Sequence, residues 1–375
     1  MKPTVLISGG GVAGLATAYW LTRFGMQCTL IERADTLRTG GQAVDVRGVA
    51  LEVLRAMRLE SSVRARRTRF RGQSRVDRNG VELQRDDTRT FSGGRLDSGD
   101  IEVFRDDLCS QLAQALAGQV EVRMGNSITG LVDDGSGITA RFSGGEARRF
   151  DLLIGADGVY SNVRRLAIDA RDSCVQMLGV GMALFTAPNL PGLDRWEWMY
   201  RDEAFGLVAY PTTDNAELRV GVGFACDPTP GLRGDVQAQK AHTLAHCGVL
   251  GGDLAALMAT LPQSPRFHYS DLAQVHLPQW SSGRTVLVGD AACCASPFSG
   301  QGTSLALVGA FVLARELART ARDPQEAFGR YEQRMRPFVD LNQALVDLTR
   351  QAPIPDAQME QAKYGIALSD LPSAA

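Results

Sequence analysis

A run of glycines beside a short apolar segment at the N-terminus most constrains how this chain can fold. The apolar segment leads directly into Gly9, Gly11 and Gly14, helix-spaced apolar residues follow, and a second apolar segment, 28–31, ends in Glu32. This order predicts a βαβ unit of a Rossmann-type parallel sheet. Such a unit needs one glycine for the tight turn, one for approach of the backbone to a pyrophosphate, and one for close packing of the helix on its strand.

The start of the predicted helix completes a nucleotide site. Unpaired N–H groups near Val12 and Ala13 and the positive end of the helix dipole favour bound phosphate. Glu32 follows the first glycine by roughly twenty residues, where a carboxylate accepts hydrogen bonds from a ribose 2′-hydroxyl and repels a 2′-phosphate. The tightly held adenosine is therefore expected to belong to FAD or NAD and not to NADP. The alternative is a glycine-rich turn in an ordinary α/β domain.

The charge balance excludes several other classes of protein. The 40 Lys and Arg residues nearly balance the 42 Asp and Glu residues, and the net charge is −2. No global field therefore draws the chain to nucleic acid or to an anionic membrane. The arginine-rich stretch 64–71 is interrupted by uncharged residues, and we interpret it as a solvated face. No segment reaches about 18 consecutive apolar residues, so no membrane span is expected.

The cysteines and histidines indicate neither a disulfide framework nor a metal site. Seven cysteines without a CxxC motif are typical of free thiols in a reducing compartment. The N-terminus lacks the apolar stretch of a signal peptide. We therefore expect a cytoplasmic protein, a monomer or homodimer, that binds neither nucleic acid nor membrane. His242 and His246 stand one helical turn apart without an HExxH carboxylate, so no metal is expected.

Two further glycine-containing turns follow apolar strands. Segment 151–164 is interpreted as a strand, a turn containing Asp157 and the start of a helix. An aspartate in such a turn can bond loop amides and bring backbone close to a ligand. Segment 284–292 contains another apolar strand that leads into Asp290, and the glycine-rich stretch 297–303 then opens a small, apolar helix. Turn chemistry alone explains either half of segment 151–164, but it explains both halves together poorly.

These motifs resemble those of the class A flavoprotein monooxygenases, the family of para-hydroxybenzoate hydroxylase, aromatic polyketide hydroxylases and tetracycline-inactivating monooxygenases. Residues 155–164 are similar to the family's DG motif, and residues 289–302 to its GD motif and the turn after it. The resemblance covers nearly the whole chain. It implies tightly bound FAD, transient NADPH or NADH, O2, and insertion of one oxygen atom into an aromatic or polyketide-like small molecule through a flavin C4a-hydroperoxide.

The resemblance also assigns site residues. It implies that Asp290 bonds the ribitol chain of FAD. Amides at the helix start would stabilise negative charge on the pyrimidine edge of reduced flavin, as an oxyanion hole does. No catalytic side chain is identified, and Pro297, Gly300 and Gly302 are expected to border the reacting flavin. The expected cofactor-binding residues are Gly9, Gly11, Val12, Ala13, Gly14, Glu32, Arg33, Gln42, Arg47, Arg105, Asp157, Gly289, Asp290, Pro297, Gly300, Gln301, Gly302 and Thr303.

Several of these assignments have a plain structural alternative. Arg33, expected over the adenine, and Arg105, expected before a cofactor-contacting helix, could each be a surface arginine. Gln42 and Arg47, expected near the isoalloxazine, could serve hydrogen bonding at a strand edge. Cys293-Cys294 replaces the histidine or tyrosine that many relatives carry. We interpret this pair as buried small hydrophobes, against covalent flavin attachment or a redox-active thiol.

The sequence pattern changes after about residue 170. Alternating segments at 177–184, 205–210 and 218–224 predict antiparallel strands, and the Asn79-Gly80 turn predicts a hairpin that joins them. The expected α/β protein therefore has two lobes and a helical C-terminus. These are a Rossmann-type FAD-binding domain with a parallel sheet (1–71, 97–170 and 272–345), a smaller, mostly antiparallel substrate lobe (72–96 and 171–271), and a C-terminal helical segment (346–375).

A substrate pocket is expected between the antiparallel lobe and the flavin ring, because ligand clefts favour domain interfaces. Its predicted lining residues are Met182, Trp198, Phe205, Tyr210, Phe224 and Pro297, with core packing as the alternative for each.

Other functions stay open on the same scaffold. A flavin oxidase, a reductase and a halogenase are the enzymatic alternatives, and a flavin-binding protein without turnover is the alternative from another class. Trp196-Glu197-Trp198 is similar to the start of the halogenase WxWxIP motif, but Met199-Tyr200 stands where Ile-Pro belongs.

Overall fold

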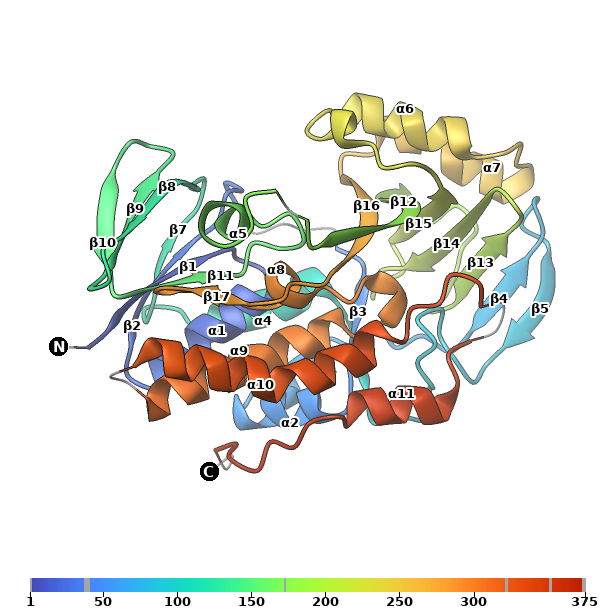
Figure 1. The fold of residues 1–375 in the computed structure, drawn as a ribbon. Helices are drawn as coiled ribbons and strands as arrows, with labels where there is room; N and C mark the ends of the chain where they lie inside the picture. The colour runs from blue at the N-terminus through green and yellow to red at the C-terminus, as the bar shows by residue number, and fades with distance from the viewer. Residues whose placement is uncertain (1, 37–40, 172, 321–322, 351–352, 373–375) are drawn as a thin grey trace.

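The computed structural model describes residues 2–36, 41–171, 173–320, 323–350 and 353–372. Two large sheets organise the chain, one mostly parallel and near the N-terminus, the other mostly antiparallel and at the far end of the molecule (Figure 1). Long helices near the C-terminal end of the chain run along the first sheet (Figure 1). None of the helices in these described ranges combines the length and apolar character needed to cross a bilayer.

The parallel sheet has six strands. All neighbouring pairs are parallel except the pair at one edge, which is a short antiparallel hairpin. The apolar residues Val5, Leu6 and Ile7 are fully buried, as expected for a parallel strand covered on both faces. In spatial order the strands are β17 (Ser281–Ser282), β18 (Thr285–Leu287), β11 (Leu152–Gly155), β1 (Thr4–Ser8), β2 (Gln27–Ile31) and β7 (Glu121–Arg123).

Three helices pack together beside this sheet. Helix α1 (Val12–Arg23) contacts both α4 (Arg105–Ala115) and α9 (Gly302–Arg319). Trp20 of α1 is fully buried, and its ring meets the edge of Phe311 of α9 at 5.0 Å between centroids. The run of small and apolar residues in α9 lets it lie close to α1, so the start of α9 is held near the start of α1.

Two small sheets complete this half of the chain. The strands β3 (Ala43–Val46) and β6 (Ile101–Phe104) form an antiparallel ribbon, in which Asp45 lies opposite Glu102 and Ala43 opposite Phe104. The second small sheet is an antiparallel meander of β8 (Ile128–Asp133), β9 (Ile138–Phe142) and β10 (Ala147–Phe150).

The other large sheet has seven strands drawn from two separate parts of the chain. Its pairs are antiparallel except for β13 with β4, which run parallel. In spatial order the strands are β16 (Phe267–Val275), β12 (Val175–Pro188), β15 (Glu217–Ala225), β14 (Phe205–Pro211), β13 (Glu197–Arg201), β4 (Gln73–Val76) and β5 (Glu82–Asp86).

The two faces of this sheet have different neighbours. Helices α6 (Val236–His246) and α7 (Gly252–Ala259) cover the outer face (Figure 1), where Leu207 and Val222 pack with Leu254 and Leu257. The inner face turns toward the β3–β6 ribbon, and Tyr210 there packs against other aromatic side chains. Alternation along each strand therefore decides whether a side chain enters the lobe core or the junction between the two lobes.

The remaining helices connect and brace these sheets. Helix α10 lies along α9, and α11 packs on α10 farther along the chain. The α-helices are α2 (Val49–Ala56), α3 (Glu60–Ala65), α5 (Asn162–Ala167), α8 (Asp290–Cys293), α10 (Pro324–Gln343) and α11 (Asp356–Lys363), and the short 3₁₀ turns are η1 (Pro230–Leu232), η2 (Leu261–Gln263) and η3 (Pro297–Ser299).

The predicted fold class is confirmed: a parallel sheet with a Rossmann-type βαβ start, an antiparallel sheet lobe and a C-terminal helix. The antiparallel strands expected at 177–184, 205–210 and 218–224 correspond to β12, β14 and β15, and the Asn79-Gly80 turn joins β4 to β5. The domain boundaries given above stay a prediction.

The Arg334→Met substitution is expected to lower the free energy of unfolding by about 2 kcal/mol, because it leaves a buried carboxylate without its main cation. Arg334 Nη1 lies 2.6 Å from Oε1 of Glu316, which is only 2% exposed, and Nη2 lies 3.0 Å from Oδ1 of Asp370. On the same helix, Arg330→Met removes an exposed pair with Glu326 and is expected to cost less than about 0.5 kcal/mol. Urea denaturation measures the free energy of unfolding of both variants. Equal losses in the two variants would contradict the stabilising role assigned to the buried Arg334–Glu316 pair.

Candidate flavin site

Three turns far apart in the sequence meet at one edge of the parallel sheet. Strands β18, β11 and β1 are neighbours, so their carboxyl ends lie together. A Cβ built on Gly9 would lie 2.4 Å from the carbonyl oxygen of Ala156, and one on Gly289 would lie 2.7 Å from Cβ of Ala13. Atoms at these separations clash, so both positions require glycine. The turns after β1, β11 and β18 are therefore in direct contact.

The glycines of the first turn have different surroundings. Gly9 adopts φ +114°, a conformation that favours glycine, and a Cβ on Gly14 would lie 1.9 Å from the carbonyl oxygen of Gly9. A Cβ on Gly11 would meet nothing within 4 Å. Gly9 and Gly14 therefore allow the turn and the helix to pack, whereas Gly11 borders open space at the start of α1. Val12 and Ala13 form the first turn of that helix, with N–H groups free to meet a phosphate.

Glu32 reaches back from the end of β2 to the glycine turn. Its Oε2 accepts a hydrogen bond from the backbone N–H of Gly10 at 2.8 Å, and its Oε1 accepts one from Ala34 N–H at 3.0 Å. These bonds hold the carboxylate beside the turn, where the sequence predicts the ribose. Arg33, the next residue, is exposed at the rim.

Asp157 organises the second turn. Its Oδ2 accepts hydrogen bonds from the backbone N–H groups of Asn162, at 2.8 Å, and Val163, at 3.0 Å, and its Oδ1 accepts one from the hydroxyl of Ser161. Burial raises the pKa of Asp157 despite these bonds. The aspartate thus fixes the loop between β11 and α5 and presents its backbone toward the other turns.

Asp290 begins α8 directly after the third turn. Its side chain is exposed, yet the surrounding protein raises its pKa by desolvation. The space that this exposed carboxylate faces, beside the three turns, is the recess of the candidate site. Gly302 is close by, since a Cβ on it would lie 3.9 Å from Oδ1 of Asp290. The third turn and the start of α9 therefore border the same recess.

The segment before α9 supplies a glycine-rich wall. Pro297 begins η3 and is exposed, and Gly300 ends it in the left-handed conformation with φ +62°. Gln301 is fully buried, and Gly302 and Thr303 form the first turn of α9 with partial exposure. Backbone N–H groups at the start of an 18-residue helix favour bound negative charge here.

Arg47 approaches this wall from β3. Its backbone N–H donates to Oγ of Ser304 at 3.1 Å, and a Cβ on Gly300 would lie 3.3 Å from its Nη1. Its guanidinium is 1% exposed and pairs with Asp45 at 2.8 Å. Gln42 and Arg105 meet nearby, because the backbone N–H of Arg105 donates to the carbonyl of Gln42 at 3.0 Å.

Two independent observations indicate that a flavin fits this recess. Arg47 Nε, a donor, and Gln301 Oε1, an acceptor, are buried and have no hydrogen-bond partner among the described residues. Buried polar atoms normally have hydrogen-bond partners. A ligand with donor and acceptor groups along one edge would supply the partners that these two atoms lack. The pyrimidine edge of isoalloxazine has both kinds of group. At the other end, the open space at Gly11 and the carboxylate of Glu32 suit a pyrophosphate and a ribose.

An aromatic shelf lies at the junction of the two lobes. The rings of Phe104 and Tyr210 are stacked with centroids 6.4 Å apart, and Phe70 meets Tyr210 edge-on at 5.7 Å. The Tyr210 hydroxyl accepts a hydrogen bond from the backbone N–H of Ala43 at 3.3 Å. The inner face of the antiparallel sheet is thereby fixed against the β3–β6 ribbon.

Three acidic residues influence one another at this junction, and one of them, Asp45, pairs with Arg47. Burial raises the pKa of Asp45 despite its ion pair with Arg47. Burial, together with the charges of Glu197 and Asp45, raises the pKa of Glu102 well above its usual range. Burial also raises the pKa of Glu197 to about 8, although the N–H of Phe91 donates to it at 2.6 Å. Glu197 is therefore mostly a neutral acid at pH 7.

Sequence reasoning missed Phe104, Asp45, Glu102 and Glu197. The cross-strand pairs of the β3–β6 ribbon place the first three on its lobe-facing side. An available signal was the two acidic residues within otherwise apolar strands, because buried carboxylates need a partner or a proton.

The residues predicted to line the substrate pocket divide between the two faces of the antiparallel sheet. Tyr210 lies on the inner face, at the lobe junction. Phe205 and Phe224 belong to the outer core, where Phe224 stacks on the ring of His246 of α6 at 4.5 Å, and Trp198 packs against that core. Met182 alternates with Ala183 of that core and so lies on the inner face. Strand alternation thus differs from the expectation that these residues share one pocket.

Cys293 and Cys294 are buried, and burial raises the pKa of both thiols. All seven cysteines are free. On the outer face of the antiparallel sheet, His246 stacks on Phe224 and His242 lies tilted beside it. Within the described ranges, no three His, Cys, Asp or Glu side chains gather as metal ligands would.

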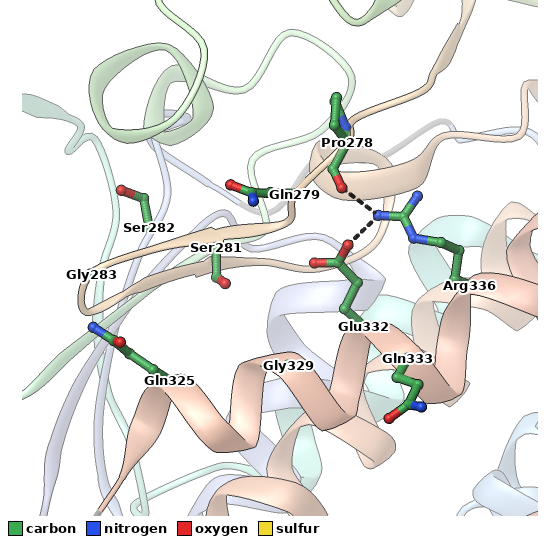
Figure 2. Close-up of a pocket in the computed structure, with 10 residues that line it drawn as sticks. All are labelled: Pro278, Gln279, Ser281, Ser282, Gly283, Gln325, Gly329, Glu332, Gln333 and Arg336. Carbon is green, nitrogen blue, oxygen red and sulfur yellow. Dashed lines mark hydrogen bonds and ion pairs between the residues drawn. The ribbon is translucent and has the colours of Figure 1, made fainter.

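A polar cavity of about 580 Å³ lies apart from the three turns, between the β17 region and α10 (Figure 2). Arg336 donates to the carbonyl of Pro278 at 3.0 Å and pairs with Glu332, which accepts from Trp280 N–H at 2.9 Å. None of the predicted site residues lines this cavity. Its charged groups are satisfied within the protein, and it is not the candidate site.

Comparison with known proteins agrees with this geometry. A family model described as an FAD binding domain matches residues 2–347. An uncharacterized protein of Mycobacterium tuberculosis is 42% identical over 370 residues, covering 98% of this chain and 99% of its own. A flavin-dependent monooxygenase of Legionella longbeachae is 35% identical over 340 residues, covering 90% and 86%. The crystal structure of tetracycline destructase Tet(55) superposes with a TM-score of 0.86 at 30% identity, covering 99% and 98%.

The chain therefore belongs to the FAD binding domain family. It is an FAD-dependent monooxygenase of class A, as its resemblance in sequence predicted.

The Gly14→Ala substitution is expected to lower stability, whereas Gly11→Ala is expected to lower flavin content. The added methyl at Gly14 collides with the Gly9 carbonyl and should lower the free energy of unfolding of the flavin-free protein by about 1–3 kcal/mol. The methyl at Gly11 meets no protein atom, so stability should change by less than about 0.5 kcal/mol. Flavin content should nevertheless fall, because the methyl occupies the predicted pyrophosphate space. Urea denaturation and flavin absorbance measure the two effects, and full flavin content in Gly11→Ala would contradict this placement.

The Glu197→Gln substitution is expected to flatten the pH dependence of stability. The pKa of Glu197 in the folded protein is about 8, above the ordinary value of 4.5, so the folded state keeps a proton that the unfolded chain releases between these values. The free energy of unfolding of the wild type should therefore fall as pH rises across this interval. Urea denaturation at a series of pH values measures the slope. The exposed Glu203→Gln change should keep the wild-type slope. An unchanged slope in Glu197→Gln would refute the raised pKa of Glu197 as its source.

Proposed function

We propose that this enzyme uses NADPH or NADH and O2 to insert one oxygen atom into an aromatic or polyketide-like small molecule that carries an acidic oxygen. The observation that carries the proposal is Arg219 of β15, a buried arginine with unsatisfied donors beside the aromatic shelf at the lobe junction.

Arg219 is 8% exposed, and its Nε and Nη1 have no hydrogen-bond partner in the part of the chain that the structure describes. Its closest carboxylate oxygens are distant for ion pairs, at 3.8 Å for Asp106 and 3.9 Å for Glu217. Burying a guanidinium whose N–H groups lack hydrogen-bond partners lowers stability, unless an anionic or strongly accepting group binds those N–H groups. A carboxylate, a phenolate or an enolate oxygen of a substrate has this chemistry.

The shelf beside Arg219 suits a planar ring. The Arg219 guanidinium lies 5.5 Å from the centre of the Phe104 ring, which in turn stacks on Tyr210. Phe104 and Tyr210 are only 3% and 4% exposed, so a flat substrate would contact the rim of this aromatic cluster and place its acidic oxygen at Arg219. Offset stacking between aromatic rings contributes about 0.5–1.5 kcal/mol beyond the area buried. The supported substrate class is therefore a planar, weakly acidic molecule.

The residues of this chain would hold and orient both partners. Bound FAD would accept hydride from NADPH or NADH and activate O2. The amides near Gly300, Gln301 and Gly302 would bind negative charge on the pyrimidine edge, and Asp290 would bond the ribitol chain. Pro297 would border the reacting face. The buried junction would exclude water, which protects a reactive oxygen species from wasteful decay. No side chain is assigned as an acid or a base.

The comparisons support the same class of substrate. The relatives named flavin-dependent monooxygenase align along most of this chain, and one structural neighbour is a tetracycline destructase, a protein named for a polycyclic polyketide. We also propose the two-lobe division of the chain given above, a cytoplasmic location in keeping with seven free thiols, and a monomeric or homodimeric state.

The test is turnover of the flavin-loaded enzyme with NADPH or NADH, air and a panel of tetracyclines, anthraquinones, rifamycins and small phenols. A substrate of this enzyme should accelerate nicotinamide oxidation and give a product heavier by one oxygen atom. Arg219→Gln should raise KM for that substrate by about tenfold or more, because a charged hydrogen bond is lost, and should leave an O-methylated analogue unaffected. Exposed Arg201→Gln is the control. Conversion of all reducing equivalents to peroxide across the panel would favour an oxidase.

A further inference from the structure

Met359 of α11 lies against two buried nitrogen donors of the candidate flavin site. Its sulfur accepts a hydrogen bond from Gln301 Nε2 at 3.1 Å and one from Arg47 Nη1 at 3.5 Å. Arg47 and Gln301 are 1% and 0% exposed, whereas Met359 is partly exposed. A thioether thus occupies a position where the surrounding protein offers polar donors.

This arrangement leaves the donors poorly satisfied. A thioether sulfur is a weak acceptor compared with an oxygen atom. Because Arg47 and Gln301 are buried, bulk water cannot supply a better partner to these N–H groups. An oxygen atom bonded to the sulfur would accept from both donors. The site therefore favours a methionine sulfoxide over the unmodified thioether more than an apolar core would.

Helix α11 is anchored so that Met359 stays at this position. Lys363 pairs with Asp100 at 2.7 Å, and Arg89 pairs with Asp356 at 2.8 Å. These two ion pairs fix both ends of α11 against the segments that precede β6. Met359, between them, is held beside the glycine-rich wall at Gly300 and Gln301, where the proposed function places the chemistry of oxygen.

We propose that Met359 is a site of oxidative modification by the hydrogen peroxide that this enzyme releases when reduced flavin meets O2 without a substrate. This inference rests on the proposed function for the source of peroxide. A sulfur lone pair attacks one peroxide oxygen, the O–O bond breaks, and the other oxygen leaves as hydroxide. The hydroxide takes the proton from the oxygen now bonded to sulfur, which gives the sulfoxide and water. The sulfur loses two electrons and peroxide gains two, so one peroxide yields one sulfoxide and one water.

The two donors assist this step and its product. As the S–O bond forms, the new oxygen takes the place of the sulfur as acceptor, and the Arg47 and Gln301 N–H groups stabilise the negative charge that grows on it. The sulfoxide oxygen then accepts from the same groups and ties α11 more firmly to the wall. Turnover is expected to slow as Met359 becomes oxidised, and methionine sulfoxide reductase is expected to restore it. Met258 and Met335, in contrast, are buried in the two apolar cores.

The experiment exposes the flavin-loaded enzyme to added hydrogen peroxide in one arm and, in the other, to air with NADPH or with NADH and no substrate. Peptide mass spectrometry follows the gain of one oxygen at Met359 and at Met124, a partly exposed methionine on the loop after β7. Met359 should be oxidised about tenfold faster than Met124 in both arms, given the donors at its sulfur. Catalase should protect it in the second arm. Wild-type activity should decay in step with Met359 oxidation, and Met359→Leu should not show that decay.

The two arms separate the possible failures. Equal oxidation rates of Met359 and Met124 with added peroxide would overturn the proposal. Selective oxidation of Met359 by added peroxide, with neither NADPH nor NADH consumed in the second arm, would support the modification site and count against the proposed function. Selective oxidation in both arms with full activity retained would overturn the predicted effect on turnover.

Discussion

The close backbone contact among three turns at the carboxyl edge of the parallel sheet determines where everything else in this molecule can lie. Gly9 and Gly289 approach their neighbours at separations that no Cβ permits. The contact is possible because β1, β11 and β18 are adjacent, and adjacent parallel strands end at the same edge. Once these turns touch, the starts of α1, α8 and α9 converge on one recess, and their amides and the Asp290 carboxylate surround it.

The second determining region is the junction between the two lobes. The β3–β6 ribbon turns one side toward the inner face of the antiparallel sheet, and that side carries both an aromatic shelf and buried acids. Packing fixes the ring of Phe104 against Tyr210, while Arg47 balances only part of the acidic charge. Burial raises the pKa values of the other two acids, Glu102 and Glu197. Arg219 stands at the other side of the shelf with open donors, so the junction is polar at both ends and apolar between them.

The parts of this fold that were predictable from sequence are those that neighbouring residues specify. A strand, a glycine turn and a helix follow one another within a few residues, so the turns containing Gly9, Asp157 and Asp290 could be assigned and their meeting anticipated. The antiparallel strands were predictable in the same way, because alternation is local. Phe205 and Tyr210 lie on the same strand an odd number of residues apart, so they occupy opposite faces, a signal that was present but not used.

The parts that were not predictable depend on pairing between distant segments. Glu197 comes close enough to feel the charge of Asp45 only because β13 joins β4 and the lobe folds over the β3–β6 ribbon. Met359 meets Gln301 because α11 packs on α10 and two ion pairs hold its ends. No local pattern marks such contacts. The roles of individual residues toward the flavin likewise stay predictions, since they depend on how the bound molecule lies in the recess.

The measurement that tests the central claim most directly is the flavin content of the purified protein. One FAD per chain, seen as a yellow protein whose cofactor is released on denaturation and identified by mass spectrometry, is the result expected if the three turns surround one flavin. A colourless protein that takes up no FAD during reconstitution would contradict the account.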